Sequence, residues 1–294
     1  MSIKELIQSK KHTFSFEVFP PKKDKSLTGI YDTIGELKQL NPDFISVTYG
    51  AMGSSKDKTV EIASKIRNEF DIESIAHLTC VTSSRKELET TLKEIKEANV
   101  DNVLALRGDI PEGFDFSTLN DNYRYASDLI KHIRNREEMT IAAACYPEKH
   151  IEANTLDKDI DNLKRKVDEG ADFLITQLFF DNELFYDYHN KLIQKGIDIP
   201  VIAGILPVLN KNQTAKIVEL SGCQFPNKFN RILERYHDDP IALKEAGTMY
   251  ATEQIIDLLS WGIKGIHLYT MNKSDTAKRI MGNIGHIRTN INGC

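Results

Sequence analysis

A single carboxylate interrupts an aromatic run near the start of the chain. In the segment FSFEVF, Glu17 lies between Phe16 and Val18. Side chains alternate between the two faces of a strand, so Glu17 and Ser15 would point inward if the aromatic residues face outward. Burying a carboxylate is costly unless it is paired or protonated. Two interpretations follow: a structural ion pair with a neighbouring lysine, or a general acid or base kept protonated by apolar neighbours.

A second carboxylate follows another apolar run. Asp109 comes after Arg107 and Gly108, directly behind the segment NVLAL. Gly108 has no side chain and would let the backbone come close to a flat ligand. Aspartate is also common in turns and at helix N-termini. The sequence alone leaves both a functional and a capping role open for Asp109.

A polar stripe lies along a predicted helix in the middle of the chain. Apolar residues at 160, 163 and 167 recur at helical spacing and would pack inward. The polar side of the same segment carries Asp159, Asn162, Arg165 and Lys166. Such a side is usually only solvated, but Arg165 and Lys166 beside Asn162 could also clamp a diphosphate.

The sequence lacks the signatures of several common sites. It has no GxGxxG segment and no P-loop, so neither type of nucleotide site is indicated. A scattered metal set could be drawn from Glu17, His77, Asp109 and His150. Their spacing gives it no specific support, and we predict no metal. Gln177 stands where a Schiff-base aldolase of the barrel type would carry lysine. A lone histidine such as His267 is more often a satisfied core residue than a ligand.

Most of these residues stand at or just after the ends of eight predicted strands. Short apolar runs alternate with longer amphipathic segments such as 84–98 and 182–195, which predicts parallel βα units. The strands are predicted at Phe14–Phe19, Phe44–Tyr49, Ser74–Cys80, Asn102–Leu106, Thr140–Cys145, Phe173–Gln177, Pro200–Gly204 and Gly265–Thr270. Eight units favour a closed (β/α)8 barrel of the TIM type, whose active site lies at the carboxyl ends of the strands.

The interval between Gly204 and Gly265 is too long for one helix. We predict the seventh barrel helix at Lys211–Leu220 and an added helix at Ile241–Trp261, ahead of the last strand. No linker, repeat or low-complexity stretch marks a boundary. We therefore predict one α/β domain over residues 1–294.

Composition narrows the class of protein. The formal net charge of −5 does not indicate nucleic-acid binding, which usually needs a basic face. No stretch approaches the ~20 apolar residues of a membrane span, and the N-terminus lacks a signal peptide. The four cysteines form no CxxC pair and are predicted to be reduced and mostly buried. A cytoplasmic enzyme is the expectation.

Eight strings at the predicted strand ends resemble the methylenetetrahydrofolate reductase family. They run in order through nearly the whole chain. They are FSFEVFPPK, FISVTYGAMGS, AHLTC, LALRGDIP, AACYPEKH, LKRKVDEGADFLITQLFFD, AGILPV and HLYTMN. Any one string is weak, but eight in order are specific.

The resemblance implies a (β/α)8 barrel that holds FAD and reduces 5,10-methylenetetrahydrofolate with NAD(P)H by a ping-pong hydride transfer. It implies Glu17 as the general acid, and Asp109 as a second catalytic residue beside flavin and pterin. Positions matching substrate contacts are Asp109, Gln177, Gln213 and Lys273. Positions matching flavin contacts are Thr48, Tyr49, Ala51, His77, Arg107, Gly108, Asp109, Ala126, Tyr146, His150, Ala153, Asp159, Asn162, Arg165 and Lys166.

Two positions depart from the family pattern. Lys273 stands where relatives can carry arginine, so the planar guanidinium is lost. Ile217 stands where an aromatic residue can stack on the ligand.

The chain leaves no room after the last strand for the regulatory domain of longer members, so that domain is not expected. The resemblance also implies a homo-oligomer, since homo-oligomers are common in the family. The alternatives are another flavin barrel oxidoreductase, such as a proline-dehydrogenase-like enzyme, or a flavin- or folate-binding protein without turnover.

Overall fold

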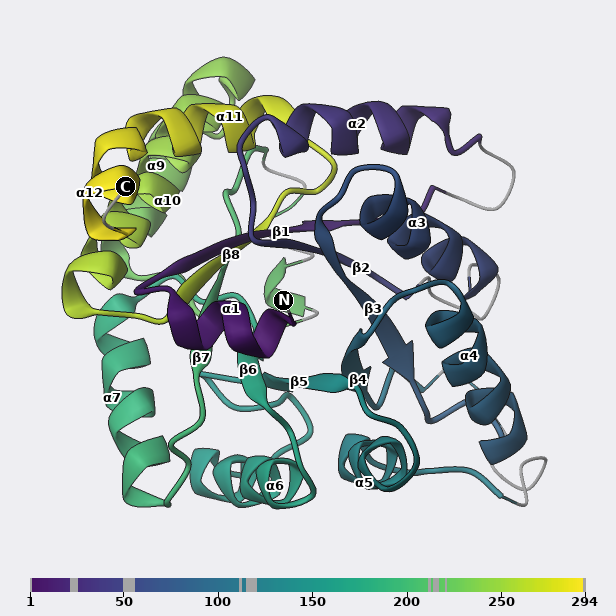
Figure 1. Ribbon diagram of the computed structural model, residues 1–294. Coiled ribbons are helices and arrows are strands. Elements are labelled where there is room, and N and C mark those ends of the chain that lie inside the picture. The colour runs from purple at the N-terminus through teal and green to yellow at the C-terminus, as the bar shows by residue number, and fades with distance from the viewer. Residues whose placement is uncertain are drawn as a thin grey trace.

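Eight parallel strands close a barrel in chain order, with β8 paired to β1 (Figure 1). The computed structural model describes residues 2–21, 26–49, 56–110, 113–114, 121–210, 213, 217–219 and 221–292. The strands are β1 (Thr13–Val18), β2 (Phe44–Val47), β3 (Glu73–Thr79), β4 (Asn102–Leu106), β5 (Thr140–Cys145), β6 (Phe173–Thr176), β7 (Val201–Ile205) and β8 (Gly265–Tyr269). The predicted barrel and its eight strands are confirmed, with small shifts at some strand ends.

Helices lie around the outside of the barrel, and the first of them covers one end of it (Figure 1). They are α1 (Ile3–Ser9), α2 (Thr28–Lys38), α3 (Lys56–Asn68), α4 (Arg85–Glu97), α5 (Ala126–Arg136), α6 (Leu156–Asp168), α7 (Asn182–Gln194), α9 (Asn227–Tyr236), α10 (Pro240–Trp261), α11 (Ser274–Asn283) and α12 (Gly285–Asn292). The predicted helix at 84–98 begins where its sequence indicates. Ser84 accepts a hydrogen bond from the backbone of Glu87, whose carboxylate accepts one from the backbone of Ser84.

The alternation along β1 separates two cores. Phe14, Phe16 and Val18 belong to the apolar layer between the barrel and its helices. Ser15 and Glu17 point into the barrel, as predicted. The interior is filled elsewhere by apolar side chains, and Ile3 and Ile7 of α1 pack against them; the strand residues are Phe44, Ile75, Leu104, Ala142, Phe173, Ile175 and Ile202. The barrel is therefore packed at the end that α1 covers.

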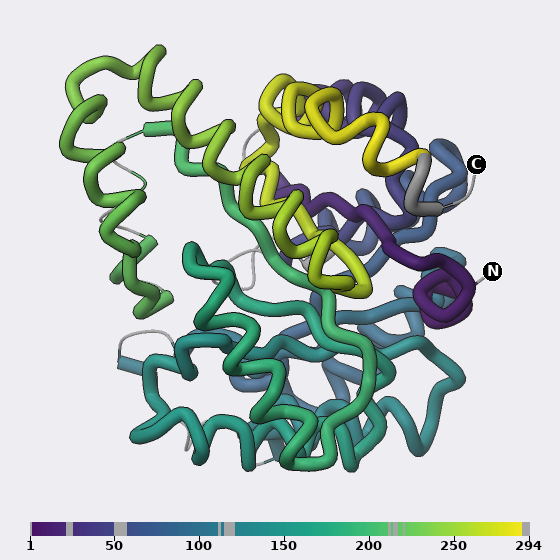
Figure 2. Tube along the Cα trace, turned by 90° about the vertical axis from the view of Figure 1, so that its left-hand side faces the viewer, coloured from purple at the N-terminus to yellow at the C-terminus, as the bar shows by residue number. Residues whose placement is uncertain are grey.

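Two helices between β7 and β8 project beyond the helical ring (Figure 2). The predicted helix at Ile241–Trp261 is confirmed as α10, which begins after Asp239 and ends at Gly262 with φ 104°. The shorter α9 precedes it and packs against it. Of the predicted seventh helix, the structure describes only residues 213 and 217–219, all helical; the rest lies outside the described residues.

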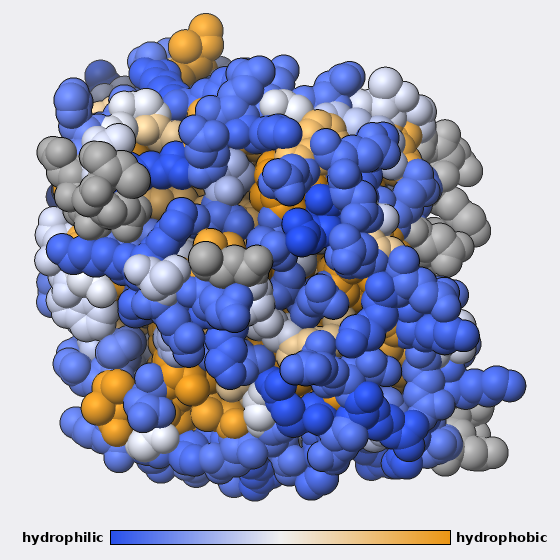
Figure 3. All heavy atoms as spheres, in the orientation of Figure 1, coloured by the Kyte–Doolittle hydropathy of each residue, from blue (hydrophilic) through white to orange (hydrophobic). Residues whose placement is uncertain are grey.

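The surface and the cysteines fit the composition. Hydrophilic residues cover most of the face in Figure 3, with smaller apolar clusters between them. Among the described helices, none is both long and apolar enough to cross a membrane. Cys80, Cys145 and Cys223 are free and buried, as predicted, and Cys294 lies outside the described residues.

Candidate active site

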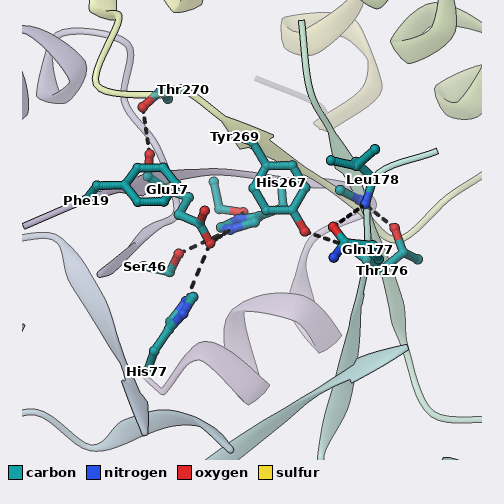
Figure 4. Close-up of polar contacts among 12 residues, drawn as sticks. Glu17, Phe19, Ser46, His77, Thr176, Gln177, Leu178, His267, Tyr269 and Thr270 are labelled. Carbon is teal, nitrogen blue, oxygen red and sulfur yellow. Dashed lines mark hydrogen bonds and ion pairs between the residues drawn. The ribbon is translucent and has the colours of Figure 1, made fainter. Parts of the chain in front are cut away.

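Glu17 lies inside the barrel near the carboxyl end of β1, and only 7% of the residue is exposed. Two imidazoles face its Oε2 atom, with Nε2 of His77 at 3.6 Å and Nε2 of His267 at 3.9 Å (Figure 4). Among the described residues no lysine pairs with this carboxyl. Lys22, Lys23 and Lys25, which follow β1, lie outside the described residues, so the lysine ion pair stays a prediction. Phe16 faces the helices, as the alternation predicts, and two histidines lie beside the carboxyl.

His77 reaches the site from β3 and is almost fully buried. Burial lowers the pKa of His77 to about 4; Glu17 opposes this shift and His267 adds to it. The imidazole is therefore neutral at neutral pH. Its Nε2 atom has no hydrogen-bond partner within the described part of the chain. The contact with Glu17 is thus not a permanent ion pair.

His267 is completely buried on β8 and is held from two sides. Its Nδ1 lies 2.7 Å from Oγ of Ser15, and its Nε2 lies 3.1 Å from Oγ of Ser46. The register explains this arrangement, because Ser15 pairs with His267 and Glu17 pairs with Ser46. Phe44 stacks on the ring at a centroid distance of 5.9 Å. The expectation of a satisfied core histidine is confirmed, but the ring also faces Glu17.

Tyr269 spans the mouth of the barrel from β8 to β6 (Figure 4). Its hydroxyl donates to the backbone carbonyl of Thr176 at 2.6 Å, and burial raises the pKa of Tyr269. Gly204 of β7 makes room for it. A Cβ atom at 204 would lie 2.6 Å from the tyrosine hydroxyl and 2.3 Å from the Thr176 carbonyl oxygen. The glycine is required by this close approach.

Asp109 lies at the rim, after β4, and is exposed. No described helix begins there, and it accepts no hydrogen bond from the described residues, so a capping role has no support. Gly108 adopts φ +87°, and a Cβ there would lie 2.9 Å from Cβ of Thr79. That backbone conformation and the packing on Thr79 explain the glycine without a ligand. Arg107 forms a bidentate pair with Glu152 at 2.5 and 2.7 Å.

Lys166 does not share the solvent-facing side predicted for it. Its ammonium donates to the backbone carbonyl of Ala144, at the end of β5, at 2.6 Å. It also lies 5.7 Å from the ring centroid of Tyr146. Burial lowers the pKa of Lys166. The solvated position predicted for Lys166 is therefore wrong, while a diphosphate contact of Lys166 and Arg165 stays a prediction.

Arg165 and Asn162 are exposed on α6, as predicted. Neither has a hydrogen-bond or ion-pair partner within the described ranges. Asp159, in the first turn of the helix, accepts a hydrogen bond from the backbone of His150 at 3.0 Å. The first turn of α6 thus meets the loop after β5, while Arg165 lies in the last turn of the helix.

The other positions that match flavin contacts lie near the same strand ends. His150 packs edge-on against Tyr146 at 4.8 Å, and burial lowers the pKa of His150. The backbone N–H of Thr48 donates to Val18 at 3.1 Å. The remaining described positions are Tyr49, half-buried after β2, Ala126, which begins α5, and Ala153, whose N–H donates to the His150 carbonyl. Ala51 lies outside the described residues.

A pocket of about 420 Å³ joins two of the predicted substrate-contact residues. Gln213, after β7, and Lys273, after β8, both line it. Oε1 of Gln213 accepts hydrogen bonds from the backbones of Leu209 and Asn210, which leaves its amide N–H groups unbound within the described chain. Lys273 is exposed at the start of α11. The pocket therefore presents amide and ammonium donors, which suit an anionic ligand.

Gln177 and Ile217 complete the predicted set. Gln177 follows β6 directly, and its side-chain oxygen accepts from the backbone of Leu178 at 2.9 Å. Ile217 is buried in an apolar cluster with Phe180 and Phe229. The described residues contain no group of three or more His, Cys, Asp or Glu side chains that could hold a metal ion.

The family model described as methylenetetrahydrofolate reductase matches residues 2–285. The chain belongs to this family. One relative of this chain is "Methylenetetrahydrofolate reductase (NADH) 1" of Arabidopsis thaliana. The two sequences are 36% identical over 97% of this chain and 50% of the plant protein. The "5,10-methylenetetrahydrofolate reductase" of Escherichia coli is 34% identical over 92% of this chain and 90% of its own length. The chain thus spans about half the length of the plant relative.

Two solved structures share the fold of this chain at low sequence identity. An uncharacterized protein from Clostridium thermocellum, described as binding two copies of 5-methyl-5,6,7,8-tetrahydrofolic acid, aligns with a TM-score of 0.63 at 14% identity, covering 98% of this chain and all of the other. A 2,3-dimethylmalate lyase aligns with a TM-score of 0.53 at 10% identity, covering 99% of this chain and 86% of the other.

The sequence did not indicate the residues that surround Glu17. Ser46 and Tyr269 belong to strands that were predicted correctly, but their neighbours depend on how the strands align across the barrel. The inward direction of Ser15 was predicted, while its contact with His267 was not. A usable signal was present: both His267 and Tyr269 alternate inward along β8, like Ser15 and Glu17 along β1.

Proposed function

We propose that this protein reduces 5,10-methylenetetrahydrofolate to 5-methyltetrahydrofolate with FAD as cofactor and NAD(P)H as electron donor. The observation that carries the proposal is the buried carboxyl of Glu17, at the carboxyl end of β1 in a barrel of the methylenetetrahydrofolate reductase family. Active sites of such barrels lie at this end of the strands. A buried acid there suits a reaction that must protonate its substrate.

The polar residues on α6 have the chemistry needed to bind the diphosphate of FAD. Arg165 has an exposed guanidinium without a partner among the described residues, beside exposed Asn162 on α6, and this pair would hold the diphosphate. Lys166 would contribute through its position under Tyr146 rather than as a second clamp. Bound FAD would supply hydride transfer between the nicotinamide and the folate.

The chain's own part in the chemistry is proton supply and charge. Ring opening of methylenetetrahydrofolate requires a proton at N10, which Glu17 would donate. The resulting cation on the substrate would be favoured by the carboxylate of Asp109 at the rim. Gln177, after β6, would hydrogen-bond the pterin and orient it over the site.

The pocket of Gln213 and Lys273 suits the other end of the folate. Folates end in a glutamate, which carries carboxylates. The exposed ammonium of Lys273 and the amide N–H groups of Gln213 would receive them. Ile217 packs into its own apolar cluster, so we infer that it does not stack on the folate ring.

Two large substrates and one barrel mouth argue for a ping-pong order. NAD(P)H and the folate would take turns at the same face. Double-reciprocal plots at several folate concentrations should be parallel. Intersecting lines would indicate a ternary complex and would overturn the ordered exchange.

The decisive experiment is spectroscopic. The purified protein should be yellow, release FAD on denaturation and bleach when NADH or NADPH is added without oxygen. Addition of methylenetetrahydrofolate should then restore the colour. A colourless protein that does not bind added FAD would count against the proposal. If a proline-type substrate bleaches the flavin and the folate does not reoxidise it, the result would favour another flavin oxidoreductase. Binding of flavin or folate without turnover would favour a carrier.

A further inference from the structure

A second pocket lies outside the barrel, beside the neighbouring helices α4 and α5 (Figure 1). Its volume is about 650 Å³, and it is lined by the first residue of α4, the segment before α5 and one side of α5 itself. Its α5 residues stand at 128, 131, 132, 135 and 136, which is the spacing of a single helical face. None of the described positions that match flavin or folate contacts lines it. The pocket is therefore separate from the proposed active site.

The side chains that line this pocket are mostly cationic or neutral donors. Arg85, Arg124, Lys131 and Arg136 contribute four cations, and Asp128 contributes the one carboxylate of the described lining. Asp128 lies in the first turn of α5, where a carboxylate compensates the positive end of a helix. The chain as a whole has a formal net charge of −5, so this local composition differs from the average. It suits an anionic ligand.

The four cations differ in how far they are already engaged. Lys131 pairs with Glu169 at 3.1 Å, and Arg136 pairs with Glu89. Arg124 is exposed and has no hydrogen-bond or ion-pair partner within the described part of the chain. Its guanidinium is therefore available to a ligand with all of its N–H groups.

Arg85 is held in place and still keeps N–H groups for a ligand. Its Nε atom lies 2.8 Å from Oδ1 of Asp121, and its guanidinium lies 4.8 Å from the ring centroid of Tyr123. No described residue accepts a hydrogen bond from its two terminal nitrogens. Two guanidinium groups, those of Arg85 and Arg124, thus line one pocket. Such planar groups bind phosphate through paired hydrogen bonds.

A buried imidazole in the pocket wall also lacks a partner. The side chain of His132 is only 4% exposed. Its Nδ1 atom lies 2.6 Å from the hydroxyl of Tyr123, but its Nε2 atom has no hydrogen-bond partner among the described residues. The carboxylate of Glu89 lies 4.0 Å from Nε2, beyond hydrogen-bond distance. Whichever ring nitrogen carries the proton, a buried polar atom stays unsatisfied, which is rare in native proteins.

We propose that this pocket binds a small molecule that carries phosphate groups. The phosphate oxygens would accept hydrogen bonds from Arg124 and Arg85. They would also compete with Glu89 for Arg136, since both side chains of that ion pair are about half exposed. Separation of the pair would open the way to Nε2 of His132. The inference does not depend on the function proposed for the barrel mouth.

Inorganic pyrophosphate and a nucleoside diphosphate share this chemistry. The ring of Tyr125 lines the pocket, and the residue is 62% exposed, so a nucleotide base would stack on it. Pyrophosphate and ADP are therefore the two probes. If ADP binds more tightly and Tyr125→Ala removes the difference, the ligand is a nucleotide. If the two affinities are equal, the diphosphate alone is recognised.

Isothermal titration calorimetry of the purified protein measures the binding of both probes. Arg124→Ala should raise the Kd about tenfold or more, because it removes one charge-assisted contact. Arg235→Ala removes the same charge from an exposed position on α9 and should leave the Kd unchanged. Absence of binding, or equal weakening in the two variants, would overturn the proposal.

Arg165→Ala separates this pocket from the proposed cofactor site, where a diphosphate would also bind. Weakening in Arg124→Ala supports the pocket beside α5. Weakening confined to Arg165→Ala would place the probe on α6 and would overturn the proposal. Failure of the proposed function would appear differently, as absent folate turnover.

Nuclear magnetic resonance locates the bound probe directly. In protein labelled with ¹⁵N-histidine, pyrophosphate should shift the ring signals of His132 and leave those of His267, inside the barrel, in place. The His132 signals are assigned by their loss in His132→Gln, or by their change in Tyr123→Phe if the first variant does not fold. A shift at His267 without one at His132 would overturn the proposal.

Discussion

Nε2 of His77 lies 3.6 Å from Oε2 of Glu17 across the interior of the barrel. The pKa of the imidazole, lowered to about 4 by burial, makes this a contact between a carboxyl and a neutral base at neutral pH. His77 therefore does not supply the permanent cation that a structural ion pair would need. It also makes the stability of the protein depend on pH.

The free energy of unfolding should fall as the pH drops from 6.5 toward 4. In this window the unfolded chain binds a proton at position 77 that the native protein does not, so the contribution is complete above pH 6.5. Urea unfolding at pH 7 and pH 4.5 measures it. The unmodified protein should lose about 2–3 kcal/mol more than His77→Asn. Equal losses would show that His77 does not resist protonation.

Glu17→Gln should separate the two half-reactions. Flavin reduction by the nicotinamide nucleotide needs no proton from this residue and should change by a small factor only. Folate reduction should fall by about 10²–10⁴-fold, the usual contribution of a general acid. Anaerobic stopped-flow measures both rates, with Glu36→Gln as a control at a surface carboxylate paired to Lys278. Equal losses in both half-reactions would mean that Glu17 is structural or orients the cofactor.

Arg165→Ala should weaken FAD binding. Its guanidinium has no partner within the described chain, so the loss of a charge-assisted contact should appear in full. We expect about 1.5–3 kcal/mol, or roughly 10- to 100-fold in the dissociation constant. Fluorescence titration of the apoprotein measures it. Lys158→Ala, an exposed lysine on the same helix, should bind FAD normally. Unchanged affinity in Arg165→Ala would leave Arg165 as a solvated surface residue.

Lys273→Ala should raise the KM for the folate about tenfold and leave flavin reduction unchanged. The ammonium lines the pocket with Gln213, where the carboxylates of the substrate would bind. Lys278→Ala is the control, because Lys278 lies one turn further along α11 and pairs with Glu36. Lys273→Arg should keep a low KM, since arginine retains the charge and adds a planar fork. A KM that is the same in Lys273→Ala would place the carboxylates elsewhere.

The sequence predicted what depends on local periodicity. The strands appear as short apolar runs between amphipathic segments, and the inward direction of Glu17 follows from alternation along β1. It could not predict which strand residues become neighbours. The contacts of His267 with Ser15 and Ser46 depend on how β8 and β2 align with β1 when the barrel closes. That alignment is a property of all eight strands together.

Helical periodicity gave the position of Lys166 on α6 but not the direction of its side chain. A lysine has several rotatable bonds, and this one bends back to the carbonyl of Ala144. Arg165, the next residue, stays in solvent as predicted. The same limit applies at Gly108, where the sequence suggested contact with a ligand and the structure shows a left-handed backbone against Thr79.

Gly204 and Tyr269 occupy one space, because any Cβ at 204 would come within 2.6 Å of the tyrosine hydroxyl. The two positions therefore cannot drift independently during evolution. A shorter residue at 269 would not by itself make room at 204, because a Cβ atom there would still lie 2.3 Å from the Thr176 carbonyl oxygen. The shorter residue would also free the Thr176 carbonyl and leave a gap at the barrel mouth. Changes at either position therefore pass through less stable sequences, so the pair should behave as a single inherited unit.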